Sequence, residues 1–100
     1  MNVTLEQVVG ILRSNADVLR ARGILHAAVF GSVARGEARP ESDIDILVDL
    51  EPGKPSGLFE YVRLQRDVAA LFGCRVDLVE REALRPLVRE EASRDAVNVF

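Results

Sequence analysis

Residues 30–50 read FGSVARGEARPESDIDILVDL, and the fold of the whole chain is best interpreted from this stretch. It passes from an apolar end through Gly31-Ser32 and a mostly polar segment into the alternating residues 43–50. Side chains two residues apart on a strand project from the same face of a sheet. Asp43 and Asp45 therefore share one face, where their like charges repel each other. Such a strand is either an ordinary solvated edge or half of a cation site.

A third acid favours the cation site. Asp77 lies in a later alternating run, RVDLV at residues 75–79, and joins Asp43 and Asp45 on one face if the two strands are neighbours. Mg²⁺ prefers hard carboxylate oxygens together with waters and phosphates. Three carboxylates can hold two such ions, of which one polarises an attacking oxygen and the other stabilises the negative charge of the phosphates. We therefore predict Asp43, Asp45 and Asp77 as metal ligands and catalytic residues, although each alone is typical of a surface acid.

The dipeptide Gly31-Ser32 supplies the complementary half of the predicted site. Glycine lets a phosphate approach the backbone closely. The start of a helix offers free amides and the positive end of its dipole, and Ser32 adds a hydroxyl donor. By itself the pair indicates only a turn. Beside a carboxylate cluster it predicts the phosphate side of a nucleoside triphosphate site.

The rest of the chain predicts the elements around this segment. A capping box, Thr4 with Gln7, and helical spacing predict a first helix over about residues 5–21. Strands are expected at 25–30, 44–50 and 75–79, a short helix at 32–37, and longer helices at 58–72 and 84–94. Leu58, Val62, Val68, Leu71 and Phe72 are expected on the apolar side of the 58–72 helix. Residues 96–100 are either a short strand or an ordered tail.

The predicted order is helix, strand, short helix, strand, helix, strand, helix, in a single domain over residues 1–100. The helix between the second and third strands suits a parallel crossover, whereas the short link between the first two suits an antiparallel pair. We expect an α/β (α+β) fold, a small mixed β-sheet with flanking helices.

Composition limits the location and the partners. The net charge of the 100 residues is −3, and no basic stripe of the kind that binds long nucleic acids is visible. No apolar run reaches the roughly 18 residues that span a bilayer, and the N-terminus is unlike a signal peptide. Cys74 is the only cysteine, which excludes an internal disulfide and favours a reducing cytoplasm. We expect a cytoplasmic protein without a membrane partner.

Together, Gly31-Ser32, ten intervening residues and Asp43-x-Asp45 resemble the minimal nucleotidyltransferases of the DNA polymerase β-like superfamily. In particular the chain is similar to the MntA-type antitoxin subunits that accompany HEPN-domain toxins. The resemblance covers essentially the whole chain, including RVDLV, and implies the nucleotidyltransferase fold.

The resemblance also implies roles for individual residues. Gly31 and Ser32 would hold the β- and γ-phosphates of ATP. Asp43 and Asp45 would ligate two Mg²⁺ ions, and Asp77 would ligate the catalytic metal and help to deprotonate or orient the acceptor hydroxyl.

Two further nucleotide-binding candidates have alternatives that the sequence leaves open. Arg35, in the family's Ala-Arg-Gly turn, either reaches the phosphates or holds the loop by pairing with Glu37, Glu41 or an aspartate. Ser42 either caps the turn before Asp43 or touches the substrate.

In the family that this chain resembles, an acceptor hydroxyl attacks the α-phosphorus of ATP and pyrophosphate leaves. The acceptor is a tyrosine of the HEPN partner, whose RNase activity is silenced. A chain of 100 residues has no room for the added helical domain of small-molecule nucleotidyltransferases. We therefore expect a protein adenylyltransferase acting as an antitoxin. The alternatives are a non-catalytic antitoxin or nucleotide sensor that neutralises its partner by binding, and transfer to a small molecule with a second subunit completing the site.

Other residues have plainer interpretations. His26 has no metal-spaced companion, and Tyr61 either packs on its helix or accepts AMP in a self-modification. The 84–94 helix and the apolar tail either pack within the chain or form the interface of a homo-oligomer.

Overall fold

The structure is a computed structural model that describes residues 3–100. The elements follow one another in the expected order, except that the first helix is divided and a 3-10 helix lies between the third strand and the last helix. They are α1 (Leu5–Ser14), α2 (Ala16–Ala21), β1 (Ile24–Phe30), α3 (Gly31–Ala34), β2 (Ile44–Leu50), α4 (Gly57–Phe72), β3 (Val76–Glu80), the 3-10 helix η1 (Arg81–Ala83), α5 (Pro86–Asp95) and β4 (Val97–Asn98). None of the helices within residues 3–100 has both the length and the apolar character needed to cross a membrane.

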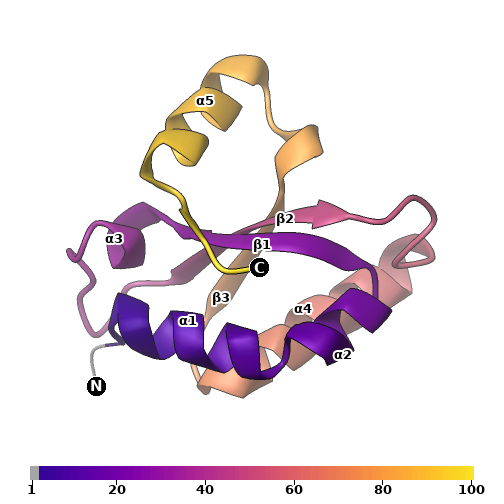
Figure 1. Ribbon diagram of the computed structural model, residues 1–100, viewed down its shortest axis with the longest axis horizontal. Helices are drawn as coiled ribbons and strands as arrows, with labels where there is room; N and C mark the ends of the chain where they lie inside the picture. Colours follow the sequence, from indigo (N-terminus) through magenta and orange to yellow (C-terminus); the bar gives the residue numbers. More distant parts are fainter. Residues whose placement is uncertain (1–2) are drawn as a thin grey trace.

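The four strands form one mixed sheet in the order β3-β2-β1-β4 (Figure 1). β1 pairs antiparallel with both β2 and β4, and β2 pairs parallel with β3. The long connection through α4 makes the parallel crossover, and the shorter segment between β1 and β2 makes the antiparallel return. The expected mixed sheet and both strand orientations are confirmed.

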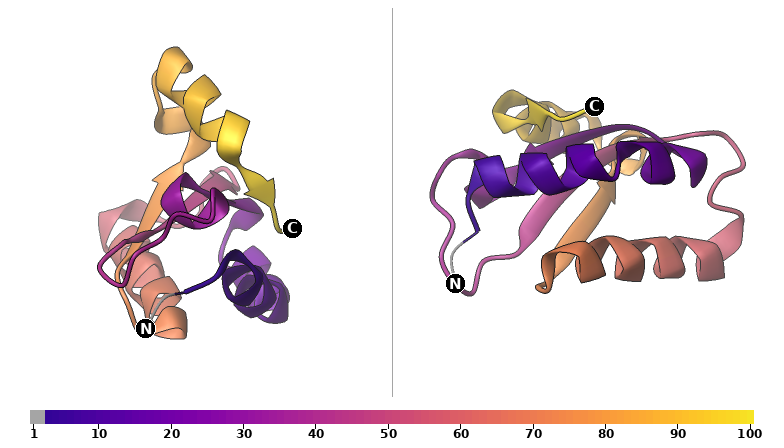
Figure 2. Two further views of the ribbon diagram at one scale, coloured as in Figure 1. Left: turned by 90° about the vertical axis from the view of Figure 1, so that its left-hand side faces the viewer. Right: turned by 60° about the horizontal axis from the view of Figure 1, so that its bottom comes forward.

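Helices cover the two faces of the sheet unequally. α1, α2 and α4 lie along one face, and α5 stands on the other (Figures 1 and 2). Ile44, Ile46 and Val48 are at most 1% exposed and belong to the main hydrophobic core. Because neighbouring side chains of a strand alternate between faces, Asp45 projects from the opposite face, on the side of α5.

The first helix is divided at Asn15, where a single helix over 5–21 was predicted. The Asn15 side-chain amide donates to the carbonyl of Ile11 at 2.7 Å, and its backbone N–H bonds to Leu12 instead. The side chain thus occupies the acceptor that the next helical hydrogen bond would use. The capping box of Thr4 and Gln7 is present as predicted.

The predicted apolar side of α4 was partly wrong. Leu64 and Val68 are the buried residues of this helix, whereas Leu58 and Val62 are 73% and 46% exposed and Leu71 is also exposed. The buried stripe follows steps of four residues through Leu64, Val68 and the half-buried Phe72. Leu58 and Val62 belong to a second stripe that faces solvent.

The C-terminal segment folds back onto its own sheet. β4 is the short strand that the sequence left open, and Val99 is buried in the core. The amide of Ala27 donates to the carbonyl of Phe100, and the amide of Val99 donates to the carbonyl of Ala27. The Arg13 guanidinium donates to the Val99 carbonyl at 3.3 Å. The tail therefore packs within the chain, while α5 has no buried residue.

Candidate active site

Strand register brings the separated sequence motifs together around Asp45. On one side Asp45 is opposite Phe30 of β1, and on the other it is opposite Asp77 of β3. Gly31 follows Phe30 directly, and Asp43 is two residues before Asp45, just ahead of β2. Asp45 of β2 thus lies between Gly31, at the start of α3, and Asp77 of β3.

The carboxyl group of Asp45 is under electrostatic strain. Burial raises its pKa above the ordinary value, and the nearby Asp77 and Asp43 carboxylates raise it further, while Arg35 acts in the opposite direction. Like charges and partial desolvation both penalise the ionised form. Asp77 and Asp43 therefore both act on Asp45, and the opposing effect of Arg35 does not cancel the rise.

The donor set fits a divalent cation, which would remove this repulsion. Within residues 3–100, no three acidic, histidine or cysteine side chains lie in an arrangement that could hold a metal by themselves. Mg²⁺ is usually held by one or two carboxylates together with waters and substrate phosphates. A cation beside Asp45 and Asp77, which are paired in register, would favour the ionised form of Asp45 that burial and the neighbouring carboxylates disfavour.

Gly31 is positioned against the carboxylate of Asp45. Its φ angle is 73°, in the left-handed region, and a Cβ at this position would overlap with Oδ2 of Asp45 and lie 3.1 Å from its Cγ. Both the conformation and the close approach require glycine. Gly31 is also the first residue of the four-residue helix α3, and Ser32 follows it, partly exposed. Gly31 therefore lies beside Asp45, and Ser32 is the next residue along α3.

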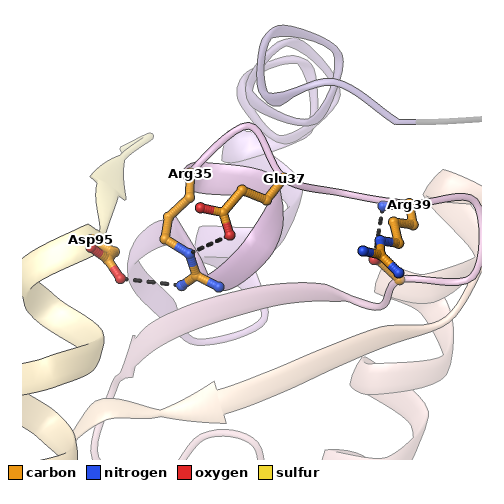
Figure 3. A network of polar contacts seen from close by, with 5 residues as sticks. Arg35, Glu37, Arg39 and Asp95 are labelled. Carbon is orange, nitrogen blue, oxygen red and sulfur yellow. Dashed lines mark hydrogen bonds and ion pairs between the residues drawn. The ribbon is translucent and has the colours of Figure 1, made fainter.

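Arg35 is held by two acids (Figure 3). Its Nε lies 3.3 Å from Glu37 Oε2, and its Nη1 lies 3.2 Å from Asp95 Oδ2 at the end of α5. Hydrogen bonds to Glu37 and Asp95 raise the Arg35 pKa above its ordinary value. In this structure Arg35 pairs with acids, which is one of its two predicted roles. Glu37 was named as a partner, and Asp95 is the aspartate that the sequence left unspecified.

Ser42 caps the turn before Asp43. Its hydroxyl accepts a hydrogen bond from the backbone N–H of Arg39 at 2.9 Å, and its own N–H donates to the Arg39 carbonyl. These two bonds fix the path of the chain into β2. The turn-capping interpretation of Ser42 is thus the one observed.

Asp95 and the cleft beside it were not predicted from the sequence. Phe30, Gly31 and Arg35 line this cleft from one side, and residues of α5 line it from the other. Asp95 is an exposed acid in a polar helix, distant along the chain from Arg35, so neither periodicity nor a motif identifies it.

Tyr61 contacts the edge strand β3, and His26 lies opposite Asp49 on the same face of the sheet as Asp45. The Tyr61 hydroxyl donates to the Leu78 carbonyl at 2.9 Å, on β3, the edge strand. Burial raises the pKa of Tyr61, and Glu80 and Asp77 raise it further. His26 is exposed on β1. Tyr61 therefore packs against the sheet edge.

The sequence pattern of one known domain covers nearly all of this chain. The model of the nucleotidyltransferase domain matches residues 5–99. The chain belongs to the nucleotidyltransferase family. Gly31, Asp43, Asp45 and Asp77 all fall inside the matched region. The predicted family and enzyme class are confirmed.

Individual nucleotidyltransferase relatives agree with this assignment. The protein adenylyltransferase MntA of Thermococcus cleftensis is 40% identical over 98 residues, which are 97% of each chain. A solved structure of a candidate minimal nucleotidyltransferase is 38% identical, with a TM-score of 0.81 over 95% of each chain. A toxin–antitoxin crystal structure with AMP-PNP has a TM-score of 0.68 at 20% identity, covering 93% of this chain and 69% of its own, and shows the shared fold. The predicted nucleotidyltransferase fold is confirmed.

Proposed function

We propose that this nucleotidyltransferase transfers AMP from ATP to a hydroxyl group of a partner protein, with Mg²⁺ as the metal. The single observation that carries a catalytic function is the convergence of Gly31, Asp45 and Asp77. Burial, followed by repulsion from Asp77 and Asp43, raises the pKa of Asp45. A chain that only binds a partner gains nothing from this electrostatic cost.

In this proposal the amides of Gly31 and Ser32 hold the β- and γ-phosphates of ATP. Asp43 and Asp45 would hold two Mg²⁺ ions, and Asp77 would help to hold one of them and to deprotonate or orient the acceptor hydroxyl. The metal supplies positive charge that stabilises the phosphates and polarises the attacking oxygen. A bond forms between the acceptor oxygen and the α-phosphorus, and the hydroxyl proton passes to Asp77. The bond from the α-phosphorus to the β-phosphate oxygen breaks, and pyrophosphate leaves. Positioning and electrostatic stabilisation account for most of the catalysis.

In the same proposal, Arg35 leaves its two acidic partners and binds the phosphates of ATP. Its guanidinium now contacts Glu37 and Asp95, both partly exposed carboxylates. A triphosphate beside Gly31 offers more negative charge and bidentate oxygen pairs, which arginine binds well. Arg35 would then turn from the acids to the phosphates.

A protein acceptor is supported by the relative from Thermococcus cleftensis, which is named a protein adenylyltransferase and aligns along almost its whole length. We propose that the acceptor is a tyrosine of a HEPN-domain toxin in the reducing cytoplasm, and that its modification makes this chain an antitoxin. A partner that brings its own hydroxyl needs no acceptor domain in this chain. Transfer to a small molecule would need a second subunit to complete the acceptor site.

The test is transfer of label from α-labelled ATP, with Mg²⁺, to a purified HEPN-domain toxin as the candidate acceptor. The double variant Asp43→Asn with Asp45→Asn should transfer no label and should fail to silence the toxin. Asp17→Asn, an exposed acid on α2, is the matched control and should behave as the wild type.

Two results would point to the alternatives. If the double variant still neutralises the toxin fully, neutralisation by binding alone replaces the catalytic proposal. If the wild type labels no protein but consumes ATP when small hydroxylated molecules are added, the acceptor is a small molecule.

A further inference from the structure

The outer face of α4, on the side of the helix away from the sheet, is left uncovered by the rest of residues 3–100 (Figure 2, right). Phe59, Val62, Arg63 and Arg66 are spaced as i, i+3, i+4 and i+7 and therefore form one stripe along this face, with Leu58 beside it. We propose that the outer face of α4 docks a partner protein through a segment that combines apolar and acidic side chains.

One end of the outer face is apolar. Phe59 is 89% exposed, and Leu58 and Val62, on either side of it, are 73% and 46% exposed. An exposed apolar patch that is bordered by polar residues marks an interaction site, and aromatic residues are enriched where such sites are buried on binding. An apolar side chain of a partner would remove this surface from water.

The other end of the outer face is basic. Neither Arg63 nor Arg66 has an ion pair among the described residues 3–100. The acids on the neighbouring flank of the helix are already engaged, because Glu60 accepts a hydrogen bond from a backbone N–H at 2.8 Å and Asp67 pairs with Arg22 at 2.6 Å. The two arginines thus present positive charge that an acidic side chain of a partner would complement.

A cleft borders the outer face on each side of α4. The cleft toward α2 has a volume of about 440 Å³, and Arg63 lines it together with Arg22 and Lys54. The cleft toward β3 has a volume of about 590 Å³, and Leu58 and Tyr61 line it. A partner can therefore place acidic side chains in the first cleft and apolar side chains in the second, as well as contacting the helix itself.

The charge and composition of the outer face favour a protein segment over other occupants. A second copy in a two-fold contact would bring the same arginines of both copies into one interface, where like charges repel. Single-stranded nucleic acid is held by stacking on several aromatic side chains along a basic groove, whereas this face has one aromatic residue, Phe59, and the chain has a net charge of −3. A helical segment with apolar residues against Phe59 and an acid one turn away matches both ends of the face.

The identity of the partner rests on the proposed function. α4 covers the face of the sheet opposite to Asp45, so a protein held on α4 leaves the proposed nucleotide site open (Figure 1). α4 also contacts β3, the strand that carries Asp77, through the hydrogen bond of Tyr61 to Leu78. We therefore assign the outer face of α4 to the protein that brings the acceptor hydroxyl.

Phe59→Ser tests the apolar end with a purified HEPN-domain toxin as the probe. Calorimetry without nucleotide should show a toxin affinity about tenfold weaker than that of the wild type, the scale of a truncated aromatic anchor. ATP affinity and label transfer at saturating toxin concentration should equal those of the wild type. Leu87→Ser is the matched control, because Leu87 is 69% exposed and lies on α5, on the other face of the sheet. It should leave all three measurements unchanged.

Arg63→Glu tests the basic end. Reversal of this charge should also weaken toxin binding by about tenfold, and the loss should shrink as salt concentration rises. Arg85→Glu is the matched control, because Arg85 is an exposed arginine at the start of α5 that also has no ion pair among the described residues. Its toxin affinity should equal that of the wild type.

Each contrary result has a distinct meaning. Unchanged toxin affinity in both variants overturns the docking surface, while the proposed function stands if the wild type still labels the toxin. Weaker toxin affinity in both variants, together with a wild type that labels no protein, supports the docking surface and overturns the proposed function. A wild-type dimer in analytical ultracentrifugation, or wild-type binding of single-stranded RNA, that Phe59→Ser abolishes assigns the face to a second copy or to RNA and overturns the inference.

Discussion

Gly31 lies against the carboxylate of Asp45, so that a methyl group on residue 31 would overlap with Oδ2 of that side chain. Strand register produces this approach, because Phe30 of β1 is opposite Asp45 of β2 and Gly31 is the next residue. The proposed phosphate-binding amide and the proposed metal-binding carboxylate are therefore fixed relative to each other by backbone hydrogen bonds of the sheet. A shift of the Gly31 backbone would therefore also move the Asp45 carboxylate.

This relationship predicts that Gly31→Ala is more harmful than an ordinary glycine substitution. Alanine at a φ of 73° costs roughly 1–2 kcal/mol from backbone strain alone, and the displacement of Asp45 adds to that cost. We expect a lower free energy of unfolding by urea denaturation and loss of label transfer from ATP.

Gly36→Ala separates these two effects. Gly36 also has a φ of 73°, but a Cβ there would meet nothing within 4 Å. It should lose stability by the backbone strain alone and keep its transfer activity. Equal losses in the two variants would show that the contact of Gly31 with Asp45 has no energetic consequence.

Asp45→Asn should stabilise the free protein at neutral pH while abolishing transfer. The folded-state pKa of Asp45 is raised by burial and by Asp77 and Asp43, so the ionised form is disfavoured in the folded state. Removal of the charge should raise the free energy of unfolding by less than about 1 kcal/mol, since the carboxyl is partly exposed to solvent. Transfer should fall by roughly a hundredfold or more.

The sign of the pH dependence follows from the same shift. With a raised folded pKa, the folded state binds the proton more tightly, so the wild type loses stability as pH rises from the ordinary aspartate pKa through the raised value. The advantage of Asp45→Asn should therefore be present at pH 7 and vanish below about pH 4. Thermal melts of both proteins over this range measure it, and an advantage that grows at acidic pH would contradict the assignment.

Tyr61→Phe should destabilise the protein without affecting transfer to a partner. The hydroxyl donates to the Leu78 carbonyl at 2.9 Å on the edge strand β3, and loss of one such bond costs about 0.5–1.5 kcal/mol. Urea denaturation followed by circular dichroism measures the change. Tyr61 is the only tyrosine in the chain, so intact-mass analysis after incubation with ATP also tests self-modification. An AMP adduct that is present in the wild type and absent from Tyr61→Phe would make Tyr61 an acceptor.

Much of the fold could be predicted from the sequence because its signals are local. The alternation of Asp43-Ile44-Asp45-Ile46 gives both the strand and its two faces, and the structure buries Ile44 and Ile46 accordingly. The expectation that Asp77 would be next to Asp45 needed only the parallel crossover, which connection length favours. Register then brings Gly31 to the same place.

The features that could not be predicted depend on contacts between distant segments. α4 has two apolar stripes, and only tertiary packing decides that Leu64 is buried while Leu58 is exposed. The first helix ends early because the Asn15 side chain takes a backbone acceptor, which helical spacing alone does not reveal. The pair of Arg35 with Asp95 joins α3 to the end of α5, and no local pattern specifies where α5 will stand.

That pair also predicts an effect on nucleotide binding. Asp95 holds Arg35 at 3.2 Å, so it competes with any phosphate for the same guanidinium. Asp95→Asn removes the competitor and one negative charge, and ATP affinity should increase by about two- to fivefold, the scale of one partly exposed ion pair. Arg35→Ala should weaken ATP binding, and both effects should shrink as salt concentration rises.

Glu90→Gln is the matched control for Asp95→Asn. Glu90 is on the same helix and pairs with Arg94 at 3.7 Å, so its substitution removes one charge from α5 and leaves Arg35 paired. Its ATP affinity by calorimetry should equal that of the wild type. Removal of a competitor for Arg35 can only raise ATP affinity. If Asp95→Asn instead weakens ATP binding, the Arg35–Asp95 pair serves to hold α5 in place beside the site.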